Sequence, residues 1–278
     1  MTATAVTSVQ VDAYGLTDVG RKRKANEDHF VIVSLQRAAR VRQTSLADPA
    51  VFDRLGGPEA FLFVVADGVG GRPGGAVASQ TAITALAEFI GQAAGCFHSL
   101  DVDQEHEFLE QLETAVRRTH QRLTEEYGAG GYGPATTLTM ATLAWPRAYL
   151  VHVGDSRAFY LRKGRLRQLT SDQTMGEYMV GAGAWTEEQA RQAPNSGVLA
   201  SAVGGGEMMI AVGLVDLQPG DVLLLCTDGL TRHVPDQRIA ELLTRAPDAE
   251  AACRELVGAA LASGGSDNVT VIVARMQG

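Results

Sequence analysis

The stretch AYLVHVGDSRAFYLRKGRLRQL, from Ala148 to Leu169, decides the fold class of this protein. Apolar and aromatic residues dominate it, and Gly or Asp interrupts it at short intervals, a pattern typical of short strands separated by turns. Lys163-Gly164 stands at the tip expected for a tight hairpin. The stretch therefore predicts consecutive antiparallel strands joined by tight turns.

Similar apolar runs predict strands elsewhere in the chain. They fall at about 9–18, 28–35, 61–66, 136–145, 207–215, 221–226 and 268–275. Two long amphipathic helices are expected at about 75–94 and 105–125, where apolar residues recur at helical spacing. Shorter helices are expected from Pro235 onward and at about 249–263. Antiparallel strands with paired helices inserted between them favour a layered α+β fold over a parallel sheet.

Two segments lack this regular pattern. The segment 171–206 is polar and Gly-rich, and the capping-box sequence Thr186-Glu-Glu-Gln189 predicts one short helix within it. We expect this segment to be a mobile flap. The segment 37–58 is expected to be a surface excursion. No internal repeat or linker is evident, so we expect one domain spanning residues 1–278.

Composition excludes several classes of protein. With 278 residues and 45% hydrophobic content, the chain can bury a large core. The net charge of −8 argues against nucleic acid as a partner, because a phosphate backbone requires a basic face. Three cysteines without paired spacing favour a reducing compartment. No apolar run is long enough for a membrane span and no signal peptide is present, so a soluble cytoplasmic protein is expected.

Aspartates stand where five of the apolar runs begin or end, at Asp28, Asp67, Asp155, Asp228 and Asp267. Clustered carboxylates are costly unless a cation lies between them. Oxygen ligands suit magnesium or manganese, whereas zinc favours the His and Cys sets that this chain lacks. Each aspartate alone is more often a turn former, so the prediction depends on their joint occurrence.

A phosphate substrate needs a fixed positive group beside such ions, and arginine offers a planar fork for it. Arg23 precedes the turn Asn26-Glu27-Asp28 and is our candidate, although an ordinary solvated basic run explains it equally well. Two ions about 3.5–4 Å apart can hold a hydroxide for in-line attack on phosphorus. The Gly-rich turn at 68–75 fits neither a Walker A loop nor a dinucleotide fingerprint.

Six motifs follow one another in order along nearly the whole chain. They are RKANED (23–28), ADGVGG (66–71), VGDSR (153–157), QLTSD (168–172), CTDGL (226–230) and GSDNVT (265–270). Together they closely resemble the bacterial branch of the metal-dependent serine/threonine protein phosphatases, the PPM or type 2C family. The resemblance implies a central sandwich of two antiparallel β-sheets flanked by pairs of α-helices, in four layers, with 171–206 as the family's variable flap.

The resemblance also assigns roles to individual residues. It implies that Asp67 bridges two manganese or magnesium ions and that the Gly68 carbonyl ligates one of them. Asp228 and Asp267 would hold the other ion, and Asp28 would contact the ions directly or through water. Arg23 matches the phosphate-binding arginine of the family.

The implied reaction is direct hydrolysis of phosphoserine or phosphothreonine by a metal-bound hydroxide, without a phosphoenzyme intermediate. Cys226 is no nucleophile, because it lies in an apolar run and lacks a CxxxxxR phosphate loop. The implied partners are phosphorylated proteins and a cognate kinase, and we expect a monomer that binds neither nucleic acid nor membrane.

The chain departs from the family pattern at several positions. Val69 stands where animal members have a histidine proposed as general acid, and Ala135, Gln173 and Ser201 replace the usual Gly, His and Arg. Leaving-group protonation is therefore expected from a metal-bound water or another group.

A third ion is a further expectation of the resemblance. Asp155 matches a ligand of the third ion in some members, but Arg232 occupies the position of its acidic partner. Two alternatives to a protein phosphatase remain open. One is a non-catalytic relative that binds a phosphoprotein, and the other is a phosphatase of small phosphorylated molecules.

Overall fold

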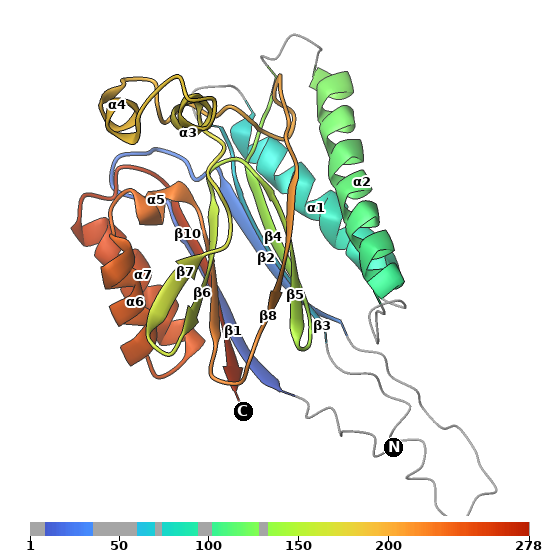
Figure 1. Ribbon diagram of the computed structural model, residues 1–278, viewed down its shortest axis with the longest axis vertical. Coiled ribbons are helices and arrows are strands. Elements are labelled where there is room, and N and C mark those ends of the chain that lie inside the picture. Colours follow the sequence, from blue (N-terminus) through green and yellow to red (C-terminus); the bar gives the residue numbers. More distant parts are fainter. Residues whose placement is uncertain (1–8, 36–59, 70–73, 94–101, 128–132, 278) are drawn as a thin grey trace, which may run out of the picture.

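Two five-stranded antiparallel sheets face each other and form the centre of the protein (Figure 1). The computed structural model describes residues 9–35, 60–69, 74–93, 102–127 and 133–277. The first sheet has the order β1 (Gln10–Asp18), β10 (Val269–Gln277), β9 (Val222–Cys226), β6 (Arg157–Arg162) and β7 (Arg165–Gln168). The second has the order β2 (Asp28–Leu35), β3 (Ala60–Asp67), β4 (Leu138–Ala144), β5 (Arg147–Val153) and β8 (Ala211–Asp216).

A pair of helices covers the outer face of each sheet, as Figure 1 shows. Helices α1 (Gly75–Ala93) and α2 (Val102–Tyr127) lie on the second sheet, and α6 (Asp236–Arg245) and α7 (Ala249–Ala262) on the first. Short helices α3 (Met175–Gly181), α4 (Glu187–Gln192) and α5 (Asp228–Thr231) lie at one end of the sandwich. The predicted four-layer α+β sandwich is confirmed.

Both faces of the central strands are buried, which explains their nearly continuous apolar sequence. In β3, Phe61, Phe63 and Val65 pack between the sheets, and Leu62 and Val64 pack under α1 and α2. Successive side chains of a strand point to opposite faces, so both layers draw on the same short segment. Each fully buried Leu or Phe stabilises the fold by roughly 1.5–3 kcal/mol. This packing gives the strand ends a rigid frame.

The hairpin prediction was right for one pair of strands and wrong for another. Strands β6 and β7 pair antiparallel through Lys163 and Gly164, whose φ angles of 51° and 76° form the tight turn. Strands β5 and β6 do not pair, because they belong to different sheets. The chain crosses between the sheets at Gly154 and Asp155. Apolar runs report that a strand is buried, but they do not report which sheet contains it.

The segment 171–206 contains two helices, α3 and α4, where one was predicted. The predicted capping box is present, with reciprocal hydrogen bonds between Thr186 and Gln189. Helices α3 and α5 were missed because helices of seven and four residues are too short for apolar periodicity. The predicted excursion at 37–58 lies outside the described residues.

Candidate metal and phosphate site

The predicted acidic residues meet at one end of the sandwich. Strands β2 and β3 pair in a register that places Asp28 directly opposite Asp67. Asp228 follows β9 and Asp267 precedes β10, and these strands are neighbours in the other sheet. Asp155 lies in the crossover between the sheets. The strand pairings thus bring together carboxylates that are up to 239 positions apart, from Asp28 to Asp267.

A cavity of about 340 Å³ opens between these strand ends. It is lined by the side chains of four of the acids and by both arginines of interest: Arg23, Asp67, Asp155, Asp228, Arg232 and Asp267. Val69, Ala135 and Ser201, three of the four positions at which other residues replace the family's usual ones, line it too. Asp28 lies behind the wall of the cavity and is only 3% exposed.

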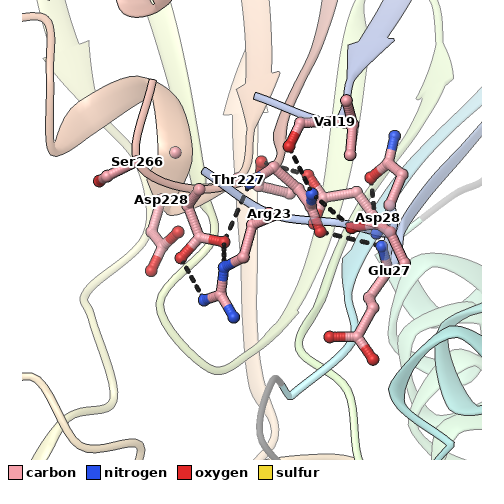
Figure 2. A network of polar contacts seen from close by, with 12 residues as sticks. Val19, Arg23, Glu27, Asp28, Thr227, Asp228 and Ser266 are labelled. Atoms are coloured by element: carbon pink, nitrogen blue, oxygen red, sulfur yellow. Dashed lines mark hydrogen bonds and ion pairs between the residues drawn. The ribbon is translucent and has the colours of Figure 1, made fainter. Parts of the chain in front are cut away.

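Two threonine hydroxyls hold the Asp28 carboxylate (Figure 2). Thr227 and Thr270 each donate to its Oδ2 atom at 2.8 Å, whereas Oδ1 is buried and has no partner among the described residues. The Asn26 amide donates to the Thr17 hydroxyl at 2.8 Å, and Thr17 lies 2.7 Å from Thr270 Oγ1. Each hydroxyl has one proton to donate, so the donors in this series of hydrogen bonds all point toward Asp28.

The backbone rather than the side chain of Asp67 is held by hydrogen bonds. Its carbonyl accepts from the Thr137 amide at 2.8 Å and from the Thr136 hydroxyl at 2.9 Å, and its amide donates to Thr137 Oγ1 at 3.0 Å. Among the described residues no side chain donates to its carboxylate. At the next position only glycine fits, because a Cβ on Gly68 would collide with the backbone of Gly75. The backbone of Asp67 is therefore fixed in place, while no described side chain donates to its carboxylate oxygens.

Asp228 and Asp267 are neutralised by arginines. Arg23 forms a fork on Asp267, with Nε 2.7 Å from Oδ1 and Nη2 2.7 Å from Oδ2 (Figure 2). Arg232 Nη2 contacts Asp228 Oδ2, and its Nη1 lies 3.6 Å from Asp267 Oδ2. Asp228 Oδ1 is buried, and nothing in the described part of the chain pairs with it. Three of the four carboxylate oxygens of Asp228 and Asp267 are thus paired with an arginine, and Asp228 Oδ1 is not.

Asn268 ties the loop that carries Arg23 to the turn that carries Asp267. Its Oδ1 accepts from the Glu27 amide at 2.9 Å, and its Nδ2 donates to the carbonyls of Val19 and Ala25 at 2.9 and 3.0 Å. A Cβ on Gly229 would collide with the Asn268 carbonyl, which explains the Asp-Gly sequence at 228–229. The two loops therefore form one unit.

His233 connects the helix that begins at Asp228 to the turn before Asp267. The Ser266 amide lies 3.1 Å from His233 Nε2, and a backbone amide can only donate, so Nε2 accepts. The proton of the neutral ring is then on Nδ1, which donates to the Gly229 carbonyl at 3.0 Å. This ring holds the two acid-bearing segments together.

Sequence reasoning assigned no role to these supporting residues. Thr227, Thr270 and Asn268 lie inside the quoted motifs, but their hydrogen bonds to the N-terminal part of the chain cross 199 to 249 positions and leave no local pattern. Gln173 has a similar supporting role, since its Oε1 accepts from the Gly154 amide at 2.9 Å beside Asp155. Motif membership was the only available signal for Thr227, Thr270 and Asn268.

Burial and nearby negative charges raise the pKa values of Asp28, Asp67, Asp155 and Asp228. The pKa of Asp28 rises to about 7, mainly because of burial, although its two threonine partners oppose the rise. Burial and the charge of Asp28 raise the pKa of Asp67 well above its usual value. Burial also raises the pKa of Asp228, and that of Asp155 rises to about 7 through burial and the charge of Asp228. A divalent cation would relieve this repulsion.

The donor set fits magnesium or manganese. It consists of carboxylates, and two buried oxygens, Asp28 Oδ1 and Asp228 Oδ1, have no hydrogen-bond partner within the described ranges. In the described part of the chain no three acidic, His or Cys side chains already converge on one point as metal ligands. The guanidinium groups of Arg23 and Arg232 lie against the acids instead, so binding an ion requires them to move.

Comparisons with a family model and with known proteins give one consistent result. The family model "Protein phosphatase 2C" matches residues 36–262. The chain is 37% identical over 217 residues to the serine/threonine protein phosphatase PstP of Mycobacterium tuberculosis, covering 77% of this chain and 40% of that protein. It is 31% identical over 264 residues to the protein phosphatase PhpP of Streptococcus pneumoniae, covering 94% and 96% of the two chains.

Solved structures show the same fold. The M. tuberculosis phosphatase PstP/Ppp superposes with a TM-score of 0.73 at 32% identity, covering 97% of this chain and all of that one. The catalytic domain of PstP in complex with 2 manganese ions gives a TM-score of 0.72 at 31% identity, covering 97% and 99%. This protein therefore belongs to the protein phosphatase 2C family. It spans 40% of the length of full PstP, and no helix among its described residues is long and apolar enough to cross a membrane.

Proposed function

We propose that this protein removes phosphate from phosphoserine and phosphothreonine in proteins, with the aid of two manganese or magnesium ions. The observation that carries this proposal is the pair of buried, unpartnered carboxylate oxygens, on Asp28 and Asp228, beside a cavity that also contains Arg23. Family membership and the names of the bacterial relatives support the same reaction. The cognate substrates would be proteins phosphorylated by a serine/threonine kinase.

In this proposal Asp67 would bridge the two ions, with the Gly68 carbonyl on one of them. Asp228 and Asp267 would hold the other, and Asp28 would contact them directly or through water. Ions bound there would activate a water molecule for attack and stabilise charge in the transition state. Two ions in the PstP catalytic domain support this number. Asp155 is the remaining acid for a third.

Arg23 is the proposed phosphate anchor. Its side chain is 42% exposed, lines the cavity and already holds an oxyanion, the Asp267 carboxylate, through two nitrogens at 2.7 Å. A phosphate group offers the same pair of oxygens to an arginine fork. Once an ion neutralises Asp267, Arg23 is free to bind phosphate instead. The planar fork then orients the phosphoryl group beside the acids.

The walls of the cavity favour a peptide substrate. Segment 197–202 supplies Gly197, Val198, Leu199 and Ala200 to one wall, and Val198 is 53% exposed. Apolar side chains beside a phosphate site suit the carbon atoms of a polypeptide better than a small polar metabolite.

The free thiols of Cys226 and Cys253 agree with a reducing compartment such as the cytoplasm.

The proposal is tested by measuring hydrolysis of phosphothreonine peptides with manganese, with magnesium and with a chelator. We expect activity that needs the metal and that is lost in Asp228→Asn. Asp216→Asn is the matched control. Asp216 is an acid on β8 that pairs with Arg147 and lies outside the cavity. Tight phosphopeptide binding without turnover would indicate a binding module instead. Activity on phosphorylated metabolites alone would indicate the small-molecule alternative.

A further inference from the structure

Arg232 lies between three of the clustered carboxylates. Its Nη2 contacts Asp228 Oδ2 and lies 3.9 Å from Asp155 Oδ2, and its Nη1 lies 3.6 Å from Asp267 Oδ2. Among the described residues it is the only cationic side chain within 4 Å of Asp155 or Asp228. It neutralises the part of the site that Arg23 does not reach.

The backbone of Arg232 is fixed, whereas its side chain is free to move. The Arg232 amide donates to the Asp228 carbonyl at 2.9 Å and closes the short helix α5. The side chain is 50% exposed and lies where the site cavity meets a second cavity of about 420 Å³ under α3 and α4. A guanidinium on a long, partly solvated side chain can therefore leave the acids without disturbing the helix.

We propose that Arg232 is a tethered counter-ion that competes with divalent cations for Asp228 and Asp267. This inference rests on the proposed two-ion function of the site. The oxygen that Arg232 covers belongs to an acid whose other oxygen, Asp228 Oδ1, is buried and unpaired. An ion on that carboxylate would come close to the guanidinium, and like charges at such distances repel. Arg232 therefore lowers the affinity for the ions.

Asp155 is the carboxylate with which the displaced Arg232 side chain would pair. It is buried, lines both cavities, and has Arg232 as its cation within 4 Å. When ions neutralise Asp228 and Asp267, Asp155 becomes the carboxylate that still needs a positive partner. The same residue then explains why this chain tolerates an acid at 155 without the second acid that a third ion would need.

A purely structural ion pair makes the opposite prediction. Asp228 and Arg232 are four positions apart, a spacing that stabilises helices modestly. If that were the whole role, neutralising Arg232 would destabilise the protein equally with and without metal. A counter-ion role predicts that the loss of Arg232 lowers stability without metal and enlarges the stabilisation by manganese.

The test is calorimetric titration of the whole chain with Mn²⁺ alone, together with melting temperatures in chelator and in saturating Mn²⁺. Arg232→Gln keeps most of the side-chain length and removes the charge, and Arg232→Lys keeps the charge. Arg238→Ala is the control, because Arg238 is an exposed arginine on α6 that pairs with Glu241 outside both cavities. We expect Arg232→Gln to tighten Mn²⁺ binding about tenfold, from removal of one nearby positive charge. Arg232→Lys and Arg238→Ala should keep the wild-type Kd within about twofold.

An unchanged or weaker Kd for Mn²⁺ in Arg232→Gln would overturn the counter-ion role while leaving the proposed function intact. Equal losses of melting temperature in chelator and in Mn²⁺ would overturn it as well. If the wild-type protein binds no Mn²⁺, the proposed function and this inference both fail.

Discussion

The two acid pairs of the site are held in contrasting ways. Asp28 and Asp67, opposite each other on β2 and β3, are positioned by hydroxyls and backbone groups, and in the described part of the protein neither has a cationic partner. Asp228 and Asp267, from the other sheet, are paired with Arg232 and Arg23. Under the proposed function, the first pair would receive a cation directly, whereas the second would exchange an arginine for one.

The largest expected effect comes from the pair formed by Asp28 and Asp67. Asp67→Asn keeps the shape and backbone contacts of the residue but removes the proposed bridging charge. We expect kcat/KM for a phosphothreonine peptide to fall on the order of 10³-fold, as when a group that stabilises transition-state charge is removed. In chelator the variant should melt at a higher temperature than the wild type, because a half-buried carboxylate that its neighbours repel is gone. Activity within tenfold of the wild type would refute the bridging role.

A smaller loss is expected from the arginine of the exchanging pair. Arg23→Ala removes a fork of two charge-assisted hydrogen bonds, together contributing about 3 kcal/mol or about 10²-fold in kcat/KM. Arg23→Lys keeps the charge without the fork, so its loss should be about tenfold. Steady-state kinetics at saturating Mn²⁺ measures both. Equal losses in the two variants would show that only charge, and not the fork, matters at this position.

The hydroxyl support of Asp28 separates the two pairs further. Thr270→Val keeps the shape of the side chain but removes one of the two donors to Asp28 Oδ2. We expect Mn²⁺ affinity, measured by titration calorimetry, to fall about tenfold, as for other hydrogen-bond partners of metal ligands. Thr270→Ser should restore most of the affinity. Thr244→Val, on an exposed part of α6, is the control. Loss of affinity in both valine variants would contradict this role.

The last prediction concerns stability rather than activity or ion binding, and a buried titratable group that needs no ion. Burial lowers the pKa of His152 to about 4, and its ring lies 2.9 Å from Thr139 Oγ1 and 3.1 Å from the Ser171 carbonyl. The unfolded chain takes up this proton near pH 6.5 and the folded chain only near 4. The contribution of His152 to stability is therefore complete above pH 6.5 and is lost as the pH falls toward 4.

Denaturant unfolding between pH 7.5 and 4 measures this loss. The free energy of unfolding should fall through this group by at most about 1.4 kcal/mol per pH unit. His152→Gln should give a shallower slope over the same window. Equal slopes in the variant and the wild type would show that the buried ring carries no such penalty.

Much of the fold and of the acid set followed from local pattern. The bounds of β2, β3 and β9 lie within one residue of those predicted. Asp28 begins β2, Asp67 ends β3, and Asp228 follows β9. The sheet that contains β6 and the helices α3 and α5 did not follow. A strand with two buried faces has no periodicity that identifies its neighbours, and a helix of one or two turns has no apolar stripe.

The sequence by itself determined which chemical groups are available: oxygen ligands at strand ends, an arginine beside them, and motifs that place the chain in one family. Only the tertiary structure decided how those groups are shared. It set Asp28 against Asp67, aimed Thr227 and Thr270 at a single oxygen, and placed Arg232 among three acids. The physical reason is that charge repulsion and hydrogen bonding act over a few ångströms, and the residues concerned are separated by up to 242 positions.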